Sequence, residues 1–215
     1  MSRAVEIAYE RVRQAILSGE FAPGDHLRES DLVAFCGVSR TPVRSALNRL
    51  AADDLITIQR NQGARVKEWP ADDVDDLFAL RALLEGYAAA RAAEHISLNQ
   101  LDKIRTSIEE MDAVLISRKP LPAKISEFLR LNTVVHASIW EASGSARLQS
   151  MLSRLVEQAL QVRTAATFTL ERIAESHHHH QELLSALVAR DGLWAEAIMR
   201  SHIRAAQASL KRPVD

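Results

Sequence analysis

The chain has 215 residues, of which 47% are hydrophobic and 26% charged, and its formal net charge is −1. This balance excludes a disordered chain, and the length suffices for two modest hydrophobic cores. No apolar run approaches the roughly 20 residues that a membrane span needs, and no cationic-then-apolar signal peptide is present, so we expect a cytoplasmic protein of two domains.

The first predicted helix, residues 5–18, is structural and ends at Gly19. A second short apolar pattern, in the sequence LRESDLVAFC, has Ser30 as a possible cap and ends at Gly37. The one cysteine, Cys36, lies in this pattern and cannot form an internal disulfide. We interpret it as a small core residue rather than a redox sensor.

The sequence GVSRTPVRSALNRL, residues 37–50, predicts a turn followed by a helix. Gly37 suits a left-handed turn, Ser39 or Thr41 can cap the helix, and Pro42 lies in the first turn, which needs no amide hydrogen. Apolar residues recur at steps of three and four, so one face packs and the other is cationic. The polar flanks carry Arg40, Thr41, Arg44, Asn48 and Arg49.

Two short helices joined by a turn that contains glycine describe a helix-turn-helix, whose second helix enters the major groove of DNA. On spacing alone, an ordinary helical hairpin with a solvated basic face is an equal alternative. The residues that follow favour DNA binding. Residues 55–58 are an extended apolar run and residues 64–67 alternate, so the turn Arg60-Asn61-Gln62-Gly63 predicts a hairpin with a cationic tip.

Residues 6–69 resemble the winged helix-turn-helix of the GntR family of bacterial repressors. The matching segments are ILSGEFAPG, Leu27 with Glu29, GVSR, PVR, Ala46-Leu47, Leu50, Leu55 and Gly63. The resemblance implies three helices and a small β-hairpin wing that bind DNA. The expected DNA-binding residues are Arg28, Ser30, Ser39, Arg40, Thr41, Arg44, Arg49, Arg60, Asn61, Gln62 and Gly63.

The net charge of this region is weak, since residues 1–69 hold ten Lys/Arg and nine Asp/Glu. Between Arg28 and Lys67, however, there are seven cationic and only four acidic residues. The cations lie on the helix and wing that would approach phosphate. A weakly charged protein needs two such surfaces to bind well. We therefore expect a homodimer on a palindromic operator in double-stranded DNA.

The linker Glu68-Trp69-Pro70 separates a winged helix-turn-helix domain, residues 1–69, from a second domain, residues 70–215. Beyond the linker every segment is typical of a helix. The six predicted helices cover about 72–95, 98–117, 122–142, 145–169, 171–190 and 193–210. The expected fold class is thus mainly α, with a winged helix-turn-helix followed by an all-α antiparallel six-helix bundle.

Four polar residues lie on apolar stripes of this bundle and are expected to point inward. Asn132 and His136 share a face of the third helix, His180 lies on the fifth and His202 on the last. Taken singly, each is more typical of a hydrogen-bonded core residue than of a ligand. Together, on three helices of one bundle, they can converge on a point. Imidazole suits zinc or nickel, and an asparagine carbonyl can supply an oxygen ligand, so the set could bind a metal ion.

Residues 72–210 resemble the FCD effector domain of the FadR subfamily within the GntR family, and the six helices resemble its VanR-type branch. Metal-binding members use an Asp or Asn four residues before a His, then two further His on the last two helices. The resemblance therefore implies that Asn132, His136, His180 and His202 bind one divalent metal ion. Asn132 stands where many members have Asp, which should weaken cation binding or favour a softer ion.

The effectors of this family are mostly small organic acids, which a metal in the pocket would attract. Arg81 could be a second carboxylate anchor, although a surface ion pair accounts for it equally well. His177, one helical turn before His180, is the expected additional pocket residue, whereas His178 and His179 are expected to be solvated. The sequence thus predicts a ligand-responsive transcriptional regulator, most simply a repressor.

Two other classes of function are weaker alternatives. A metal-dependent helical enzyme would use the histidines as a catalytic site, but the chain lacks an HExxH helix and the Glu and Glu-x-x-His set of di-iron bundles. An architectural DNA-binding protein without an effector would not need polar residues in the bundle core.

Overall fold

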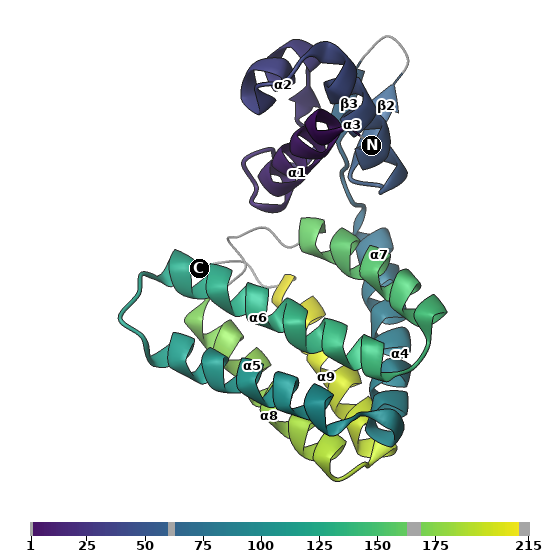
Figure 1. Ribbon diagram of the computed structural model, residues 1–215, viewed down its shortest axis with the longest axis vertical. Coiled ribbons are helices and arrows are strands. Elements are labelled where there is room, and N and C mark those ends of the chain that lie inside the picture. Colours follow the sequence, from purple (N-terminus) through teal and green to yellow (C-terminus); the bar gives the residue numbers. More distant parts are fainter. Residues whose placement is uncertain (1, 60–62, 163–168, 211–215) are drawn as a thin grey trace. The chain divides into compact units, whose positions relative to one another are not determined.

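The structure is a computed structural model that describes residues 2–59, 63–162 and 169–210 (Figure 1). The chain divides into two compact units, one that contains residues 2–74 and one that contains residues 75–156 and 169–210. The described residues hold nine helices and one small antiparallel sheet, which confirms the predicted, mainly α fold class. No helix in these ranges is long and apolar enough to cross a membrane.

The first unit contains three helices and three short strands. They are α1 (Arg3–Leu17), β1 (His26–Leu27), α2 (Glu29–Cys36), α3 (Arg40–Ala52), β2 (Ile56–Gln59) and β3 (Gly63–Val66). This order confirms the predicted winged helix-turn-helix. The residues Arg60, Asn61 and Gln62, predicted at the tip of the wing, lie outside the described residues.

The wing, formed by β2 and β3, belongs to a three-stranded antiparallel sheet of order β1-β3-β2. In the predicted hairpin, Ile56 pairs with Val66, and Gln59 pairs with Gly63. The third strand was not predicted. It consists of only two residues, with His26 opposite Arg65, which is too short to produce an alternating pattern in the sequence.

The turn between α2 and α3 has the predicted glycine geometry but differs from the prediction at the helix caps. Gly37 adopts φ 65° and ψ 30°, the left-handed conformation, and its N–H donates to the carbonyl of Val33. Ser39 takes the N-cap position of α3 without a side-chain cap hydrogen bond. The prediction of Ser30 as a cap is wrong: α2 begins at Glu29, and the Ser30 hydroxyl donates to Asp31 inside the first turn.

One hydrophobic core holds the first unit together. It includes Val12 from α1, Leu32 from α2, Leu47 and Leu50 from α3 and Val66 from β3. Cys36 belongs to this core as well, and burial raises the pKa of its thiol. The apolar stripe of α3 is thus buried, which leaves the opposite face of that helix to solvent.

The second unit is a bundle of six helices, as predicted. They are α4 (Ala71–His95), α5 (Leu98–Ile116), α6 (Leu121–Ala142), α7 (Ala146–Val162), α8 (Leu170–Val188) and α9 (Gly192–Leu210). Predicted and observed bounds agree within two residues, except at the end of α7, which was predicted at about residue 169; residues 163–168 lie outside the described ranges, and Thr169 is the N-cap of α8. The breaks have local causes, such as the capping box that Ser97 and Gln100 form at the start of α5.

The helices of the bundle pack as neighbours in Figure 1, with α5 against both α6 and α8, and α8 against α9. The first helix of the bundle, α4, contacts α9. Gly86 of α4 lies beside the Glu196 and Arg200 side chains, and Gly192 of α9 lies beside the backbone of Ala90. Leu84 and Ala88 of α4 also pack against Leu148 and Leu152 of α7. The arrangement places inward-facing residues of α4, α6, α8 and α9 in one interior.

Arg190, in the connection between α8 and α9, ties that connection to the end of α4. Its guanidinium donates to the backbone carbonyls of Ala93, Glu94 and Ile96, at 3.4, 3.2 and 3.0 Å. These are carbonyls at a helix C-terminus, which have no partner within the helix. The contact joins residues that lie more than 90 positions apart in the chain.

Candidate functional site

The exposed face of α3 borders an open groove of about 610 Å³ in the first unit. The groove also has walls from the start of α2 and from strands of the sheet. Its polar lining residues are His26, Arg28, Glu29, Ser30, Arg40, Arg44 and Asn48. A helix face with three arginines nearby, beside a β-hairpin, is the arrangement with which a winged helix approaches a DNA groove.

Most of the residues predicted to bind DNA lie in or beside this groove. Arg28, Ser30, Arg40, Arg44 and Gly63 line it. Ser39 and Thr41 are exposed at the start of α3.

Arg49 lies elsewhere on α3 and is engaged within the first unit. Its Nη1 donates to Oε2 of Glu6 at 2.8 Å, and its guanidinium lies 3.6 Å from the centre of the Tyr9 ring. The contacts hold α3 against α1. The sequence pattern placed Arg49 on a basic flank but did not reveal this partner, because Glu6 lies 43 residues earlier.

Glu29 is a groove residue for which the sequence predicted no role. Its carboxylate accepts two hydrogen bonds from Arg44, Nε to Oε1 at 2.9 Å and Nη2 to Oε2 at 3.1 Å. These bonds, together with the positive charges of Arg44 and Arg40 and against a smaller opposing effect of burial, lower the pKa of Glu29. The carboxylate is therefore ionised at neutral pH.

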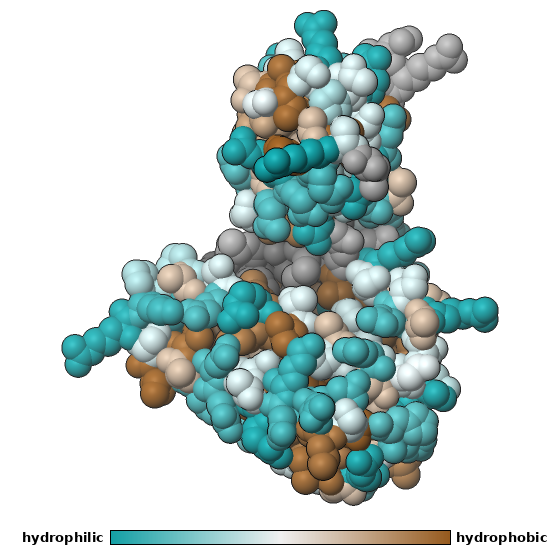
Figure 2. Space-filling model, in the orientation of Figure 1, coloured by the Kyte–Doolittle hydropathy of each residue, from teal (hydrophilic) through white to brown (hydrophobic). Residues whose placement is uncertain are grey.

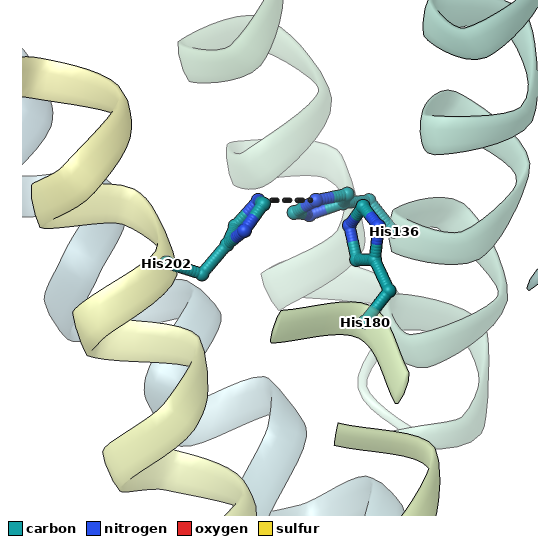
Figure 3. Close-up of side chains that lie close together, drawn as sticks. All are labelled: His136, His180 and His202. Atoms are coloured by element: carbon teal, nitrogen blue, oxygen red, sulfur yellow. Dashed lines mark hydrogen bonds between the residues drawn. The ribbon is translucent and has the colours of Figure 1, made fainter. Parts of the chain in front are cut away.

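In the second unit, His136, His180 and His202 come together from α6, α8 and α9 (Figure 3). All three are buried, and one ring nitrogen of each lies within 4.8 Å of the others. The Nε2 atoms of His136 and His202 are 3.2 Å apart. The convergence that the helical stripes predicted for these three histidines is thus confirmed.

Glu85 of α4 is the buried anion beside this cluster, and its Oε2 lies 2.6 Å from Nδ1 of His136. The same carboxylate pairs with Arg81 one turn earlier, at 2.8 Å. Burial favours the neutral acid, but the charges of Arg81 and His136 and their hydrogen bonds outweigh it and hold the pKa of Glu85 at about 2. The Glu85 carboxylate is therefore ionised, and it can only accept a hydrogen bond from His136.

This pairing fixes how His136 presents its ring. Because Glu85 accepts, Nδ1 of His136 carries a hydrogen, and in the neutral ring Nε2 is left with a lone pair directed at His180 and His202. A carboxylate behind a histidine in this way is a common arrangement around metal-binding histidines. No sequence pattern indicated this pairing, since Glu85 and His136 are 51 residues apart.

Several buried nitrogens of the cluster lack a hydrogen-bond partner among the described residues. They are both ring nitrogens of His180, Nδ1 of His202 and the neighbouring indole nitrogen of Trp140. Burial, with the charges of neighbouring histidines, holds the pKa values of His180 and His202 well below the usual range, so both rings are neutral. Neutral imidazoles with free lone pairs are ligands for borderline metal ions.

The spacing of the cluster suits one ion. Two nitrogen ligands of a tetrahedral zinc ion, with bonds of about 2.0–2.1 Å, lie about 3.3 Å apart. The separation of 3.2 Å between His136 and His202 matches this value. The third histidine would need only a small shift to join them, since all three ligand atoms already lie within 4.8 Å.

Asn132, the fourth predicted ligand, is half-buried one helical turn before His136. Three of the four predicted ligands, the histidines, are observed close together. The role of Asn132 as the fourth ligand stays a prediction.

Arg81 and His177, the predicted effector contacts, are both buried. A surface ion pair was one interpretation of Arg81, and it is wrong, because Arg81 is 5% exposed and its partner Glu85 is fully buried. His177 Nε2 lies 2.6 Å from Oδ1 of Asp112 on α5. The expectation that His179 is solvated is also wrong in part: its ring lies edge-on to His202, with centroids 5.8 Å apart, and its Nδ1 is buried.

Two family models match the chain. The model of bacterial regulatory proteins of the gntR family matches residues 4–66, and the model of the FCD domain matches residues 76–205. The first range holds the groove beside α3, and the second holds all three histidines of the cluster and Glu85.

Curated relatives with similar sequences are transcriptional regulators by name. The HTH-type transcriptional repressor GlaR of Escherichia coli (strain K12) is 29% identical over 203 residues, with 91% of this chain and 90% of that protein covered. A probable D-xylose utilization operon transcriptional repressor of Paenarthrobacter nicotinovorans is 29% identical, with 88% and 81% covered. The solved structure of E. coli McbR/YncC has the same fold, with a TM-score of 0.82, 21% identity and 98% of both chains covered.

Proposed function

The chain belongs to the gntR family of bacterial regulatory proteins and carries an FCD domain, and from this premise we propose that it is a repressor that a small organic acid releases from or directs to its operator. The family and the named relatives make it a transcriptional regulator and not an enzyme. The groove beside α3 supports direct operator binding. The six-helix unit supports the further proposal that it belongs to the VanR-like branch.

In the proposed DNA complex, α3 enters the major groove and presents Arg40 and Arg44 to base edges. Both residues line the groove of the first unit, on the side of α3 opposite its buried stripe. Arginine recognises guanine through two hydrogen bonds to O6 and N7. The wing is proposed to approach the adjacent minor groove or the DNA backbone.

Substitution of Arg44 by alanine is expected to weaken operator binding tenfold or more, because a bidentate arginine contact is worth about 1–3 kcal/mol. The measurement is a mobility-shift titration at fixed salt, on a duplex selected by the wild type from a random library. Arg13→Ala is the matched control, since it removes the same charge from α1 of the same unit. Equal affinities of both variants would exclude Arg44 from the contact surface.

We propose that the protein is a homodimer formed through an apolar surface of α4 and α7. Exposed hydrophobic side chains occur at several places on the second unit (Figure 2). On α4, however, Leu80, Leu83 and Tyr87 form a stripe, and each is about half exposed. Met151 of the adjoining α7 is exposed to the same degree. A stripe that continues over two helices favours an interface, whereas single exposed residues do not.

The double substitution Leu83→Glu and Tyr87→Glu is expected to convert the dimer to a monomer, because it buries two unpaired charges in the interface. The mass in solution, from light scattering after size exclusion, is the measurement. Leu98→Glu with Ile116→Glu is the control, since these residues are even more exposed, at 75% and 86%, but lie on α5. A dimer that persists in the first variant, or a monomeric wild type, would contradict the proposal.

A divalent ion, zinc or nickel, is proposed at His136, His180 and His202, with Asn132 as the fourth ligand. The observation that supports it is the set of buried, neutral ring nitrogens that lack other partners. When bound, the ion would supply a Lewis-acidic centre for the carboxylate of the effector. Arg81 and His177 are the proposed contacts of the effector on either side of the cluster.

The effector must discriminate between two states of the protein in order to act. Moving a two-state population from 1:99 to 99:1 requires a preference of about 5.5 kcal/mol for one state. A carboxylate that contacts both the metal and Arg81 can make such a difference, because Arg81 is buried and positively charged and the ion would add a second positive charge.

A further inference from the structure

We infer that Glu29 is a positioning residue that aims the free edge of Arg44 at a guanine of the operator. This inference rests on the proposed binding of DNA by α3. Glu29 is the first residue of α2, and Arg44 lies in the second turn of α3, so their ion pair joins the two helices of the helix-turn-helix. Both residues line the groove beside α3.

The two hydrogen bonds decide which part of the Arg44 guanidinium remains available. Glu29 takes the side edge, since its oxygens accept from Nε and from Nη2. A guanidinium has five N–H groups in one plane. Three hydrogens remain, and the outer edge presents one of Nη1 and one of Nη2, which is the pair of donors that guanine O6 and N7 require.

Glu29 leaves this outer edge accessible. The Arg44 side chain is 70% exposed, whereas the Glu29 side chain is only 35% exposed. An arginine paired with a carboxylate has given up some rotamer freedom before DNA arrives, so it loses less when it binds a base. The carboxylate also fixes the plane of the guanidinium, and a bidentate contact depends on that plane.

The main competing idea is that Glu29 masks Arg44 and must be displaced by DNA. Masking would need the carboxylate to cover the edge that reads the base, but Glu29 occupies the other edge. An anion near phosphate disfavours DNA binding in general. Positioning and masking therefore predict opposite effects on sequence preference when the negative charge of Glu29 is removed.

Asp31 provides a matched control for that charge. It lies in the same first turn of α2 as Glu29, and its carboxylate accepts from Ser30 rather than from an arginine. Asp31→Asn and Glu29→Gln remove one negative charge from the same helix end, so they change the general attraction to phosphate and the helix dipole interaction alike. Only Glu29→Gln alters the support of Arg44.

The experiment begins with selection of duplexes from a random library by the full-length wild type. The affinities of wild type, Glu29→Gln, Asp31→Asn, Arg44→Ala and the Glu29→Gln/Arg44→Ala double variant are then measured on the selected duplex and on a scrambled one. We expect Glu29→Gln to lower the ratio of selected to scrambled affinity about five- to tenfold, and Asp31→Asn to leave that ratio unchanged. In the Arg44→Ala background, Glu29→Gln should have no further effect on the ratio, because the two residues act as one unit.

Three results would overturn the inference. One is a Glu29→Gln variant whose ratio equals or exceeds that of Asp31→Asn. Another is a loss of equal size with and without Arg44, which would indicate that Glu29 acts on the fold and not through the arginine. The third, a wild type that selects no sequence, would overturn the proposed operator binding together with this inference.

Discussion

Alanine at Glu85 is expected to destabilise the helical unit by about 3–5 kcal/mol, the range for breaking a buried ion pair by removal of one partner. The carboxylate is fully buried and binds both Arg81 and His136. Its loss would leave Arg81, which is 5% exposed, as a buried cation without a counter-charge. The free energy of unfolding of the metal-free protein in urea, followed by helical circular dichroism, is the measurement.

Glu94→Ala is the control for this substitution, since Glu94 is an exposed residue of the same helix. Its effect should stay within about 0.5 kcal/mol, as for ordinary surface changes. The difference between wild type and Glu85→Ala should also depend on pH. Because the pKa of Glu85 is lowered from 4.5 to about 2, the stabilisation is complete above pH 4.5 and decreases as the pH falls toward 2. A loss below about 1 kcal/mol would mean that Arg81 finds another partner or water.

Zinc or nickel is expected to raise the melting temperature of chelator-treated wild type, and His180→Ala is expected to abolish this rise. If the ion binds only the native state, the stabilisation is about 2.7 kcal/mol at a hundredfold excess over Kd. The His180 ring lies in the cluster with both nitrogens buried and unpaired among the described residues, so its removal takes away one of three converging ligands. Binding of an organic acid should fall in the same variant.

His178→Ala is the control for the metal experiment, because His178 is two residues away in the same run of histidines but has a side chain that is 71% exposed. It should keep the full response to metal. The competing interpretation is a cluster of histidines that hydrogen-bond to one another, as His136 and His202 do at 3.2 Å. That interpretation predicts some destabilisation in His180→Ala and a melting temperature that ignores every divalent ion in both proteins.

The elements that could be predicted from the sequence are those that local chemistry determines. Gly37 allowed the left-handed turn between α2 and α3, and Ser97 began α5 with a capping box. The apolar stripes on α6, α8 and α9 gave the inward direction of His136, His180 and His202, because three- and four-residue spacing places residues on one face of a helix. Convergence of the three residues then followed from their position in one bundle.

The features that were missed depend on partners far away in the chain. Glu85 lies one helical turn after Arg81 on α4, but spacing could not show that His136, 51 residues later, is its second partner. The same holds for Glu29 and Arg44, which are 15 residues apart on two helices. Asn132 illustrates the limit of face arguments: it shares a stripe with His136, yet it is only half-buried. The rotation of a helix around its axis is set by packing, and spacing alone gives it only approximately.

The long-range contact of Arg190 has a consequence for the order in which the chain folds during synthesis. The core of the first unit is complete once residue 66 has been made, so this unit can fold while the rest is still being translated. The end of α4 must instead wait for Arg190, nearly a hundred residues later, before its last carbonyls find their donors. The histidine cluster waits longer still, for His202 of α9. A growing chain therefore has α3 in place well before His136, His180 and His202 can come together.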